Sequence, residues 1–298
     1  MNSVLITGAN GFLGYYLVQQ LLEKNYTVVA TGKGECRLPF NKQNFTYRTL
    51  DFVNGEEVKN LFEELKPDVV IHSGAISKPD ECEVNKENAF LINVSGTVNL
   101  LRESSKNRSH FIYLSTDFVF DGEEGFYKED DIPSPVNYYG ETKLIAESEV
   151  KKYQDKWAIV RTVLVYGKTF SGRDNIVTHV AKALQRGETL KIFADQVRTP
   201  TYVEDLAKGI LSIIEKGANG IFHISGEDVK TPYEIAVAVA EYIDADKDFI
   251  IKVTSETFQP HNNTARRPAK TGFDILKAKR ELDYQPVSFE EGLRKTLG

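Results

Sequence analysis

The chain is short of cysteine and of basic charge, and each shortage excludes a class of function. Its 298 residues include only two cysteines, Cys36 and Cys82. They stand far apart and lack a metal-ligand spacing, so we expect reduced thiols rather than a disulfide framework. The formal net charge is −6, which leaves no basic excess to neutralise the phosphates of a nucleic acid. A small phosphorylated ligand needs only local donors and stays compatible with this charge.

Long apolar runs are also missing. No run approaches the length of a membrane span, and Met1 leads directly into a short apolar stretch without the basic segment of a signal peptide. We therefore expect a cytoplasmic protein without a membrane partner. Hydrophobic residues make up 41% of the chain, which is enough for a large core in one domain or in a domain with a smaller lobe.

The chain does contain a regular alternation of short β-branched runs and amphipathic helical stretches. Several expected strands are continuously apolar, as in Val69-Val70-Ile71, which is typical of a parallel sheet covered by helices on both faces. The alternation predicts an α/β fold with a doubly wound parallel sheet, of the Rossmann type. Expected strands are 3–7, 27–31, 46–50, 68–72, 110–115 and 158–162, and expected helices are 12–24, 58–65, 87–105 and 139–151.

Beyond about residue 167 the alternation loosens and the loops lengthen. We assign residues 1–166 to a Rossmann domain, and 167–204 with 225–298 to a smaller C-terminal lobe. A helix at 206–215 and a strand at 221–224 still follow the earlier pattern. Residues 205–224 are therefore expected to return to the first domain.

Three glycines at three-residue spacing, Gly8, Gly11 and Gly14, follow the first expected strand and open the first expected helix. At such a turn backbone N–H groups can approach a phosphate that a Cβ would block, and the helix dipole favours negative charge. A glycine triplet alone is a weak signal, but its context here predicts a dinucleotide site. Further cofactor contacts in the turn are expected from Asn10, Phe12 and Leu13.

The end of the second expected strand indicates which nicotinamide cofactor is bound. An acidic residue there would bond the ribose 2′-OH and repel a 2′-phosphate. Instead the strand ends in Thr31, and Lys33 follows. This favours NADPH, with NADH left open because Glu35 is close. Asp51, after the third strand, either accepts a hydrogen bond from the adenine amino group or is a strand-end turn residue.

Tyr139 and Lys143 stand four residues apart and share one face of an expected helix. An ammonium beside a phenol lowers the phenol pKa, so Tyr139 is a candidate to exchange a proton near neutral pH. The alternative is an exposed i,i+4 pair. Upstream, Thr116 stands at the C-terminal end of an expected strand, the edge at which open parallel sheets bind ligands. A hydroxyl at this edge can polarise a carbonyl beside Tyr139.

The glycine turn, the strand-end hydroxyl and the Tyr-x-x-x-Lys pair together resemble the extended short-chain dehydrogenase/reductase superfamily over nearly the whole chain. Within it, Ser-Thr-Asp-Phe-Val-Phe-Asp-Gly at 115–122 is most similar to the signature of the dTDP-4-dehydrorhamnose reductases, as are 127–129, 133–140, 161–167 and 265–268. The resemblance implies that Thr116, Tyr139 and Lys143 form a catalytic triad. The implied reaction is hydride transfer from NADPH to a 4-keto-6-deoxy sugar nucleotide, as in dTDP-L-rhamnose synthesis, with Tyr139 protonating the new alkoxide.

The resemblance makes residues 1–166 the NADP(H)-binding domain and the C-terminal lobe the substrate-binding lobe, and it also assigns ligand contacts. Arg198 replaces a glycine of the family pattern and is similar to the diphosphate-binding arginine of sugar-nucleotide epimerases. Substrate contacts are expected from Asp117, Phe118, Val165, Arg198 and Arg267. Additional cofactor contacts are expected from Phe52, Ser73, Gly74, Ala75, Asn93 and Thr162.

Two departures leave other functions open. Tyr15 and Tyr16 follow Gly14, where some members of the family carry a glutamate that helps bind magnesium between subunits, so we expect no metal site. Phe118 stands at the second carboxylate position of the dehydratases, which argues against dehydration. An NAD-dependent epimerase remains an alternative, as does a non-catalytic NADP-binding regulatory subunit that resembles the methionine adenosyltransferase β subunit. The chain is expected to be a monomer or a homodimer, and its sequence leaves the nucleotide and the sugar undetermined.

Overall fold

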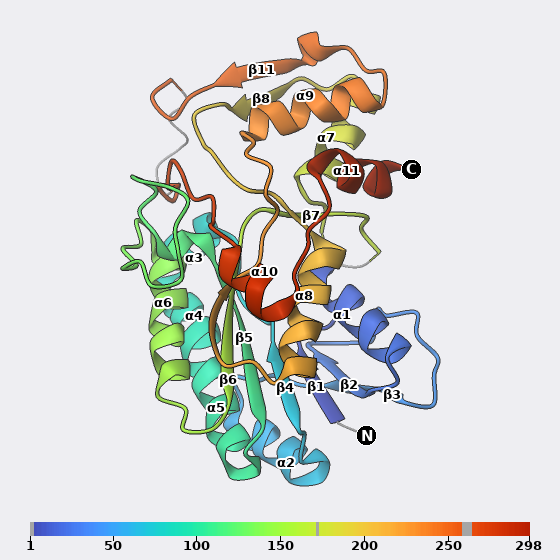
Figure 1. The fold of residues 1–298 in the computed structure, drawn as a ribbon, viewed down its shortest axis with the longest axis vertical. Helices are drawn as coiled ribbons and strands as arrows, with labels where there is room; N and C mark the ends of the chain where they lie inside the picture. The colour runs from blue at the N-terminus through green and yellow to red at the C-terminus, as the bar shows by residue number, and fades with distance from the viewer. Residues whose placement is uncertain (1–2, 171–172, 258–263) are drawn as a thin grey trace.

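The computed structural model of the chain describes residues 3–170, 173–257 and 264–298. Within these residues the main sheet has seven strands, all parallel, in the order β10-β6-β5-β4-β1-β2-β3 (Figure 1). This confirms the predicted fold class. The strands are β1 (Ser3–Thr7), β2 (Thr27–Gly32), β3 (Phe45–Thr49), β4 (Val69–His72), β5 (His110–Thr116), β6 (Trp157–Thr162) and β10 (Gly220–His223).

The strand order creates a switch point beside β1. This strand lies between β2 and β4, so Thr7 is opposite both Thr31 and His72. The chain runs outward from β1 to β3 and then returns to β4 on the other side of β1. In open parallel sheets a crevice forms outside the carboxyl ends of the strands where the order reverses in this way. The loops after β1 and β4 are therefore the expected ligand edge.

Alternating side chains along β1 divide the core into two layers. Val4 and Ile6 pack with residues of α1 (Phe12–Glu23) and α8 (Val203–Lys216). Leu5, which points to the other face, packs with residues of α2 (Gly55–Leu65), α5 (Gly96–Asn107) and α6 (Tyr138–Lys151). Figure 1 shows these two helix groups on opposite sides of the sheet. Because both faces are covered, β4 is buried along its whole length, which explains its continuously apolar sequence.

Helix starts follow local caps. Helix α2 (Gly55–Leu65) begins three residues before the predicted position, because the Asn54 side chain accepts hydrogen bonds from the N–H groups of Glu56 and Glu57. Helix α6 (Tyr138–Lys151) begins after Asn137, whose side chain accepts from the N–H of Gly140. Both caps are polar residues, so the apolar periodicity alone does not locate these helix starts.

The helix predicted over 87–105 is interrupted. It consists of α4 (Lys86–Phe90), a π-helical turn η1 (Leu91–Ser95) and α5 (Gly96–Asn107). A π turn inserts an extra residue and often marks a functional site. Here the turn contains the buried Asn93. Apolar periodicity does not distinguish such a turn from a continuous α-helix, so the sequence prediction missed it.

The second half of the chain forms a smaller group of helices and strands, at the top of Figure 1. Helices α7 (Ile176–Gln185), α9 (Pro232–Tyr242) and α11 (Phe289–Leu297) share a separate apolar core. Two short parallel pairs accompany them, β8 (Leu190–Phe193) with β11 (Ile250–Val253) and β7 (Val165–Tyr166) with β9 (Thr201–Tyr202). Strand β10 joins the main sheet beside β6. The division of the chain into a cofactor domain and a substrate-binding lobe stays a prediction.

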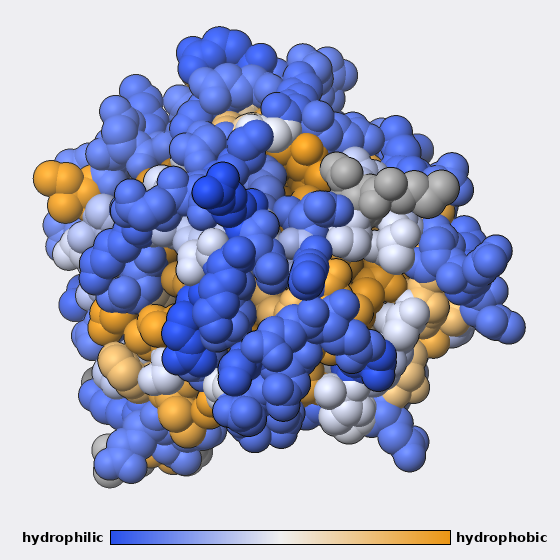
Figure 2. Space-filling view, turned by 90° about the horizontal axis from the view of Figure 1, so that it is seen from below, coloured by the Kyte–Doolittle hydropathy of each residue, from blue (hydrophilic) through white to orange (hydrophobic). Residues whose placement is uncertain are grey.

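The remaining elements are short. They are α3 (Pro79–Val84), η2 (Asp117–Val119), η3 (Lys247–Phe249) and α10 (Leu276–Leu282). Seen from below, the surface is largely hydrophilic with scattered hydrophobic residues (Figure 2). Within the described parts of the chain, none of the helices combines the length and apolar character needed to cross a bilayer.

Candidate active site

The glycine turn after β1 packs directly against the loop after β4. Gly8 has φ +73°, and a Cβ added there would lie 2.7 Å from the Gly74 backbone nitrogen. A Cβ on Gly14 would lie 2.3 Å from the Ala9 carbonyl oxygen. The Ser73 hydroxyl fastens the same contact by donating to the Thr7 carbonyl oxygen at 2.7 Å. Two of the three predicted glycines are therefore required by close backbone approach, before any ligand is considered.

The N-terminus of α1 opens onto this edge. Helix α1 has no side-chain hydrogen bond at its cap and no acidic residue in its first turn, so no carboxylate of that turn opposes the positive end of its dipole. These features fit an anionic group. Leu13 is buried in the core, so it can offer only its backbone to a ligand, while Phe12 packs edge-on against Tyr16.

Asn10 organises the segment after β2. Its amide donates to the Glu35 carbonyl oxygen at 2.9 Å and to the Tyr47 hydroxyl at 2.8 Å, and its oxygen accepts from the Arg37 N–H at 2.9 Å. The Arg37 guanidinium contacts the Asn10 carbonyl oxygen at 3.3 Å. Asn10 therefore fixes an exposed arginine beside the glycine turn. Arg37 was not among the predicted cofactor residues, although a second basic residue after β2, beyond Lys33, could have indicated it.

Three predicted cofactor residues near this edge have other partners. Lys33 and Asp51, expected to contact different parts of the cofactor, form an exposed ion pair at 2.9 Å. Thr31 is 1% exposed and donates its hydroxyl to the Ile6 carbonyl oxygen at 3.0 Å. The prediction that the Thr31 side chain contacts the cofactor does not fit this arrangement, because the hydroxyl points into the sheet.

Phe52, Thr162 and Val165, three further predicted contacts, also pack against protein groups near this edge. The Phe52 ring packs so closely under the loop that a Cβ on Gly74 would lie 2.7 Å from it. Thr162 donates its hydroxyl to Thr201 at 3.2 Å, and Val165 pairs with Thr201 in the short β7–β9 sheet. Ala75 follows in the β4 loop and is partly exposed.

The structure brings Thr116 and Tyr139 together. Helix α6 lies directly on the backbone that follows β5, since a Cβ on Gly140 would be 2.1 Å from the Phe118 carbonyl oxygen. The Thr116 hydroxyl hydrogen-bonds the Tyr139 phenol, and the Phe118 ring packs edge-on against Tyr139 at 5.8 Å. Gly140 therefore also belongs to the site, although the sequence pattern placed it only within the motif at 133–140 and did not predict this contact.

Burial sets the protonation state of Tyr139. The phenol is 8% exposed, and this burial raises the pKa of Tyr139, while the bond from Thr116 lowers it. Lys143 was expected to lower this pKa. That expectation is wrong for the protein without ligands, because desolvation of the Tyr139 phenol dominates. A raised pKa keeps the phenol protonated at neutral pH, which suits a proton donor.

Lys143 is buried on the same face of α6. Its ammonium donates to the Leu114 carbonyl oxygen at 2.7 Å and lies 4.0 Å from the centre of the Tyr113 ring. Burial lowers the pKa of Lys143 to about 7, against the nearby Glu147 carboxylate, which raises it. The pair of Tyr139 and Lys143 is therefore not the exposed i,i+4 pair that the sequence left open.

Asn93 connects the β4 loop to α6. Its side-chain oxygen accepts from the Ile76 N–H at 2.8 Å, and its amide donates to the Ile76 carbonyl oxygen at 3.1 Å and to Thr142 at 3.0 Å. Thr142 stands between Tyr139 and Lys143 in the sequence. Asn93 was predicted to contact the cofactor; the structure instead uses its side chain to position the loop and the helix.

Two predicted substrate residues form a buried clamp. Asp117 accepts from Thr116 at 3.1 Å and from the Thr271 hydroxyl, and its carboxylate lies 3.8 Å from the Arg198 Nε. Arg198 is 4% exposed and also donates to the carbonyl oxygens of Val197, Ala269 and Pro268 and to the Gln196 side chain. The predicted diphosphate contact of Arg198 is therefore wrong in this arrangement, since its donors already bind protein oxygens.

Arg267 is similarly occupied. Its guanidinium forms a two-pronged contact with Asp80 at 3.0 and 2.8 Å and donates to the Ala265 carbonyl oxygen at 2.8 Å. The hydrogen bond from Arg267 holds the pKa of Asp80 below its usual value. Arg267 therefore fastens the C-terminal segment to the start of α3, and the structure does not turn it toward the Thr116–Tyr139 pair.

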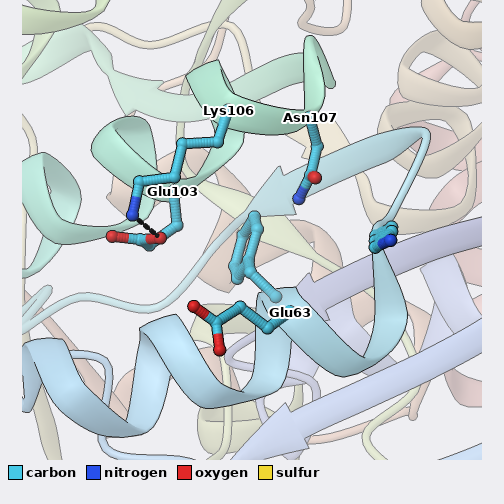
Figure 3. Close-up of a pocket in the computed structure, with 6 residues that line it drawn as sticks. Glu63, Glu103, Lys106 and Asn107 are labelled. Atoms are coloured by element: carbon cyan, nitrogen blue, oxygen red, sulfur yellow. Dashed lines mark hydrogen bonds and ion pairs between the residues drawn. The ribbon is translucent and has the colours of Figure 1, made fainter.

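A pocket elsewhere on the molecule carries no such chemistry. Figure 3 shows it between α2 and α5, with the Glu103–Lys106 ion pair of 2.6 Å on its wall. These helix ends lead into the starts of β4 and β5, the opposite edge of the sheet from Thr116. Within the described residues, no three histidine, cysteine, aspartate or glutamate side chains gather in a way that could hold a metal ion.

We predict that Gly14→Ala lowers the free energy of unfolding by about 2 kcal/mol, because the new methyl group displaces α1 from the turn. The same displacement should weaken binding of the predicted dinucleotide, measured by fluorescence titration. Gly187→Ala is the control, because a Cβ there meets no atom within 4 Å although its φ is +68°. It should cost about 1 kcal/mol and leave binding unchanged. Unaltered affinity in Gly14→Ala would contradict the packing argument.

We also predict that Arg198→Met lowers the free energy of unfolding by about 3 kcal/mol, because it leaves the buried Asp117 carboxylate without its countercharge. Adding Asp117→Asn should restore part of the loss. Denaturant unfolding measures both effects. Arg186→Met removes an exposed arginine that pairs with Glu188 at 2.7 Å and should change stability little. If the two arginine variants behave alike, the clamp is not a stabilising element.

Known proteins are similar in sequence to this chain over nearly its whole length. The sequence profile described as RmlD substrate binding domain matches residues 1–298. The spore coat polysaccharide biosynthesis protein SpsK of Bacillus subtilis (strain 168) is 30% identical over 300 residues, covering 100% of this chain and 97% of that protein. The methionine adenosyltransferase 2 subunit beta of Xenopus laevis is 32% identical over 299 residues, covering 98% of this chain and 86% of that protein.

A solved structure agrees closely. The dTDP-4-dehydrorhamnose reductase from Bacillus anthracis str. Ames, in complex with NADP, superposes with a TM-score of 0.87 at 31% identity and covers 99% of both chains. The full-length profile match and the relatives at 30–32% identity agree with the resemblance drawn from the motifs. The chain therefore belongs to the RmlD substrate binding domain family, within the extended short-chain dehydrogenase/reductase fold.

Proposed function

We propose that this protein is an NADPH-dependent reductase of a 4-keto-6-deoxy sugar nucleotide, similar to the dTDP-4-dehydrorhamnose reductases. The observation that carries the proposal is the buried hydroxyl pair of Thr116 and Tyr139, with Lys143 beneath it, at the carboxyl edge of the sheet. This edge also carries the glycine turn at the switch point. A sugar-nucleotide oxidoreductase is also the activity that the reductase relative supports.

The residues present fit a dinucleotide. The glycine turn and the uncapped start of α1 would hold its diphosphate. Lys33 and Arg37, both exposed beside the turn, would reach a 2′-phosphate, and that phosphate would compete with Asp51 for Lys33. The NADP complex of the Bacillus anthracis relative supports the choice of NADPH over NADH.

The chemistry assigned to the protein is proton delivery. NADPH would supply a hydride to the sugar carbonyl carbon. Tyr139, kept protonated by burial, would donate its phenolic proton to the oxygen that becomes an alkoxide. Thr116 would hold that oxygen beside the phenol, and Lys143 would bind the nicotinamide ribose. The hydrogen bond between Thr116 and Tyr139 and the burial of Lys143 on the same helix support these roles.

Arg173 is the strongest candidate for the substrate phosphates. Its guanidinium donates to the Ser77 hydroxyl at 2.9 Å, and its charge lowers the pKa of Tyr139, which places it near the phenol. Arg198 and Arg267 are fastened to protein oxygens, so they are no longer proposed as phosphate contacts. Phe118, partly exposed and packed on Tyr139, stays a candidate for the sugar face.

A cofactor-binding regulatory subunit is the second candidate, favoured by the 32% identity to the methionine adenosyltransferase subunit. A panel of 4-keto sugar nucleotides, each monitored for NADPH oxidation, separates the two functions. Oxidation with a dTDP-linked 4-keto-6-deoxy sugar would support a place in dTDP-L-rhamnose synthesis. NADPH binding without oxidation by any member of the panel favours the regulatory role. Abundant NAD retained by the purified protein would point to an epimerase.

Tyr139→Phe is expected to lower turnover by about 10²–10⁴-fold, the usual contribution of a general acid, and to leave NADPH affinity nearly unchanged. Lys143→Ala should reduce both turnover and NADPH affinity. Steady-state kinetics and fluorescence titration measure these effects. Tyr138→Phe provides the matched control on the adjacent residue. Retained turnover in Tyr139→Phe would show that another group delivers the proton.

Cofactor preference gives a separate prediction. Lys33→Ala and Arg37→Ala should each weaken NADPH binding by about tenfold, the effect of losing one charge-assisted contact. NADH binding should change little, because NADH lacks the 2′-phosphate. Lys24→Ala, which removes an exposed lysine paired with Glu215 at the far end of α1, is the control. Equal losses for NADPH and NADH would contradict the assignment.

A further inference from the structure

Glu147 is a buried carboxylate that the proposed mechanism does not use. It stands four residues after Lys143 on α6 and is completely buried. Its two oxygens accept from the Ser115 hydroxyl at 2.6 Å and from the Arg161 guanidinium at 2.9 and 2.7 Å. These bonds join α6 to the adjacent strands β5 and β6, immediately below Thr116 and Thr162.

Arg161 gives Glu147 one balancing charge. It is also completely buried, with its guanidinium 5.0 Å from the Phe120 ring and 3.4 Å from the His223 Nε2. Burial lowers the pKa of His223 well below its usual value, so this imidazole is neutral. The polar centre between α6 and the sheet is therefore one carboxylate and one guanidinium, both desolvated.

A buried ion pair of this kind is a weak source of stability. Desolvation of both charges offsets much of their attraction, and well-packed apolar residues of similar size often serve equally well. The geometry of the pair is more informative. It fixes a negative charge on the same helix face as Lys143, one turn further along.

The groups around Lys143 show why that charge matters. Strand β5 contributes the Tyr113 ring and the Leu114 carbonyl oxygen, both neutral. The pKa of Cys82 on α3 is raised to about 11 and that of His72 on β4 is lowered to about 3, so neither is charged at neutral pH. Tyr139, on α6, is protonated. Among the described groups that act on Lys143, Glu147 supplies the negative charge.

We propose that Glu147 is a positioning residue that favours the protonated form of Lys143, and that Ser115 and Arg161 hold its carboxylate in place for this purpose. The inference rests on the proposed function, because the protonated lysine is the form assigned to the nicotinamide ribose. It extends that function by adding a purely electrostatic effect, in which Arg161 positions the Glu147 carboxylate and that carboxylate favours the charged form of Lys143. No proton is transferred between the three residues.

The sign of the effect is fixed by electrostatics. An opposite charge nearby favours the protonated amine, so Glu147→Gln lowers the pH at which Lys143 loses its proton. We expect a downward shift of about one pH unit or more in the titration of the Lys143 Cε signal, followed by ¹³C NMR on lysine-labelled protein. Lys143→Arg assigns the signal. The pH above which NADPH binding weakens should fall in parallel, measured by fluorescence.

Matched variants distinguish an electrostatic role of Glu147 from a purely structural one. Glu147→Asp keeps the charge and should retain most of the wild-type titration. Glu147→Gln combined with Arg161→Met leaves no unpaired charge, so it should fold and still show the lowered titration. Glu103→Gln removes another buried carboxylate, paired with Lys106 at the opposite edge of the sheet, and should reduce stability without moving the Lys143 signal.

Two results would overturn the proposal. One is a wild-type Lys143 titration in the double variant. The other is a double variant that does not fold, which would show that the pair serves the fold itself. Both readouts need only the protein and NADPH. A panel of sugar nucleotides that gives no turnover would therefore refute the reductase function without affecting this test.

Discussion

The close approach of backbones at the carboxyl edge of the sheet is the constraint on which the site depends. Gly8 meets Gly74 where β1 and β4 end, Gly14 brings α1 against Ala9, and Gly140 lets α6 rest on the Phe118 carbonyl. At each of these places a Cβ would separate two main-chain segments. Because the segments are in contact, the start of α1, the β4 loop and the Thr116–Tyr139 pair are held at the same edge of the sheet.

Two buried ion pairs then fix the positions of these segments relative to one another. Asp117 and Arg198 join the end of β5 to loops of the C-terminal half, and Glu147 and Arg161 join α6 to β5 and β6. Such pairs contribute little net stability, but a displaced partner leaves an uncompensated charge. They therefore favour one geometry over nearby alternatives. Thr116 donates a hydrogen bond to Asp117, and Lys143 stands one helical turn before Glu147.

The same logic explains which arginines remain available to a ligand. Arg198 and Arg267 carry the sequence features of anion contacts, yet both bind protein oxygens in the folded chain. Arg37 and Arg173 belong to no motif, yet both lie exposed, Arg37 beside the glycine turn and Arg173 in hydrogen-bond contact with Ser77 of the β4 loop. A guanidinium serves equally as a clamp or as a ligand contact, and only its neighbours decide between the two.

The sequence by itself determined the parallel sheet, the glycine turn and the pairing of Tyr139 with Lys143, because these depend on local periodicity and spacing. Continuous apolar strands require two covered faces, and residues four apart must share a helix face. Tertiary structure alone decided that Thr31 points into the sheet, that Lys33 pairs with Asp51, that Asn93 sits in a π turn, and that burial raises the pKa of Tyr139. These outcomes depend on contacts between distant segments and on desolvation, neither of which is encoded in the spacing of residues along the chain.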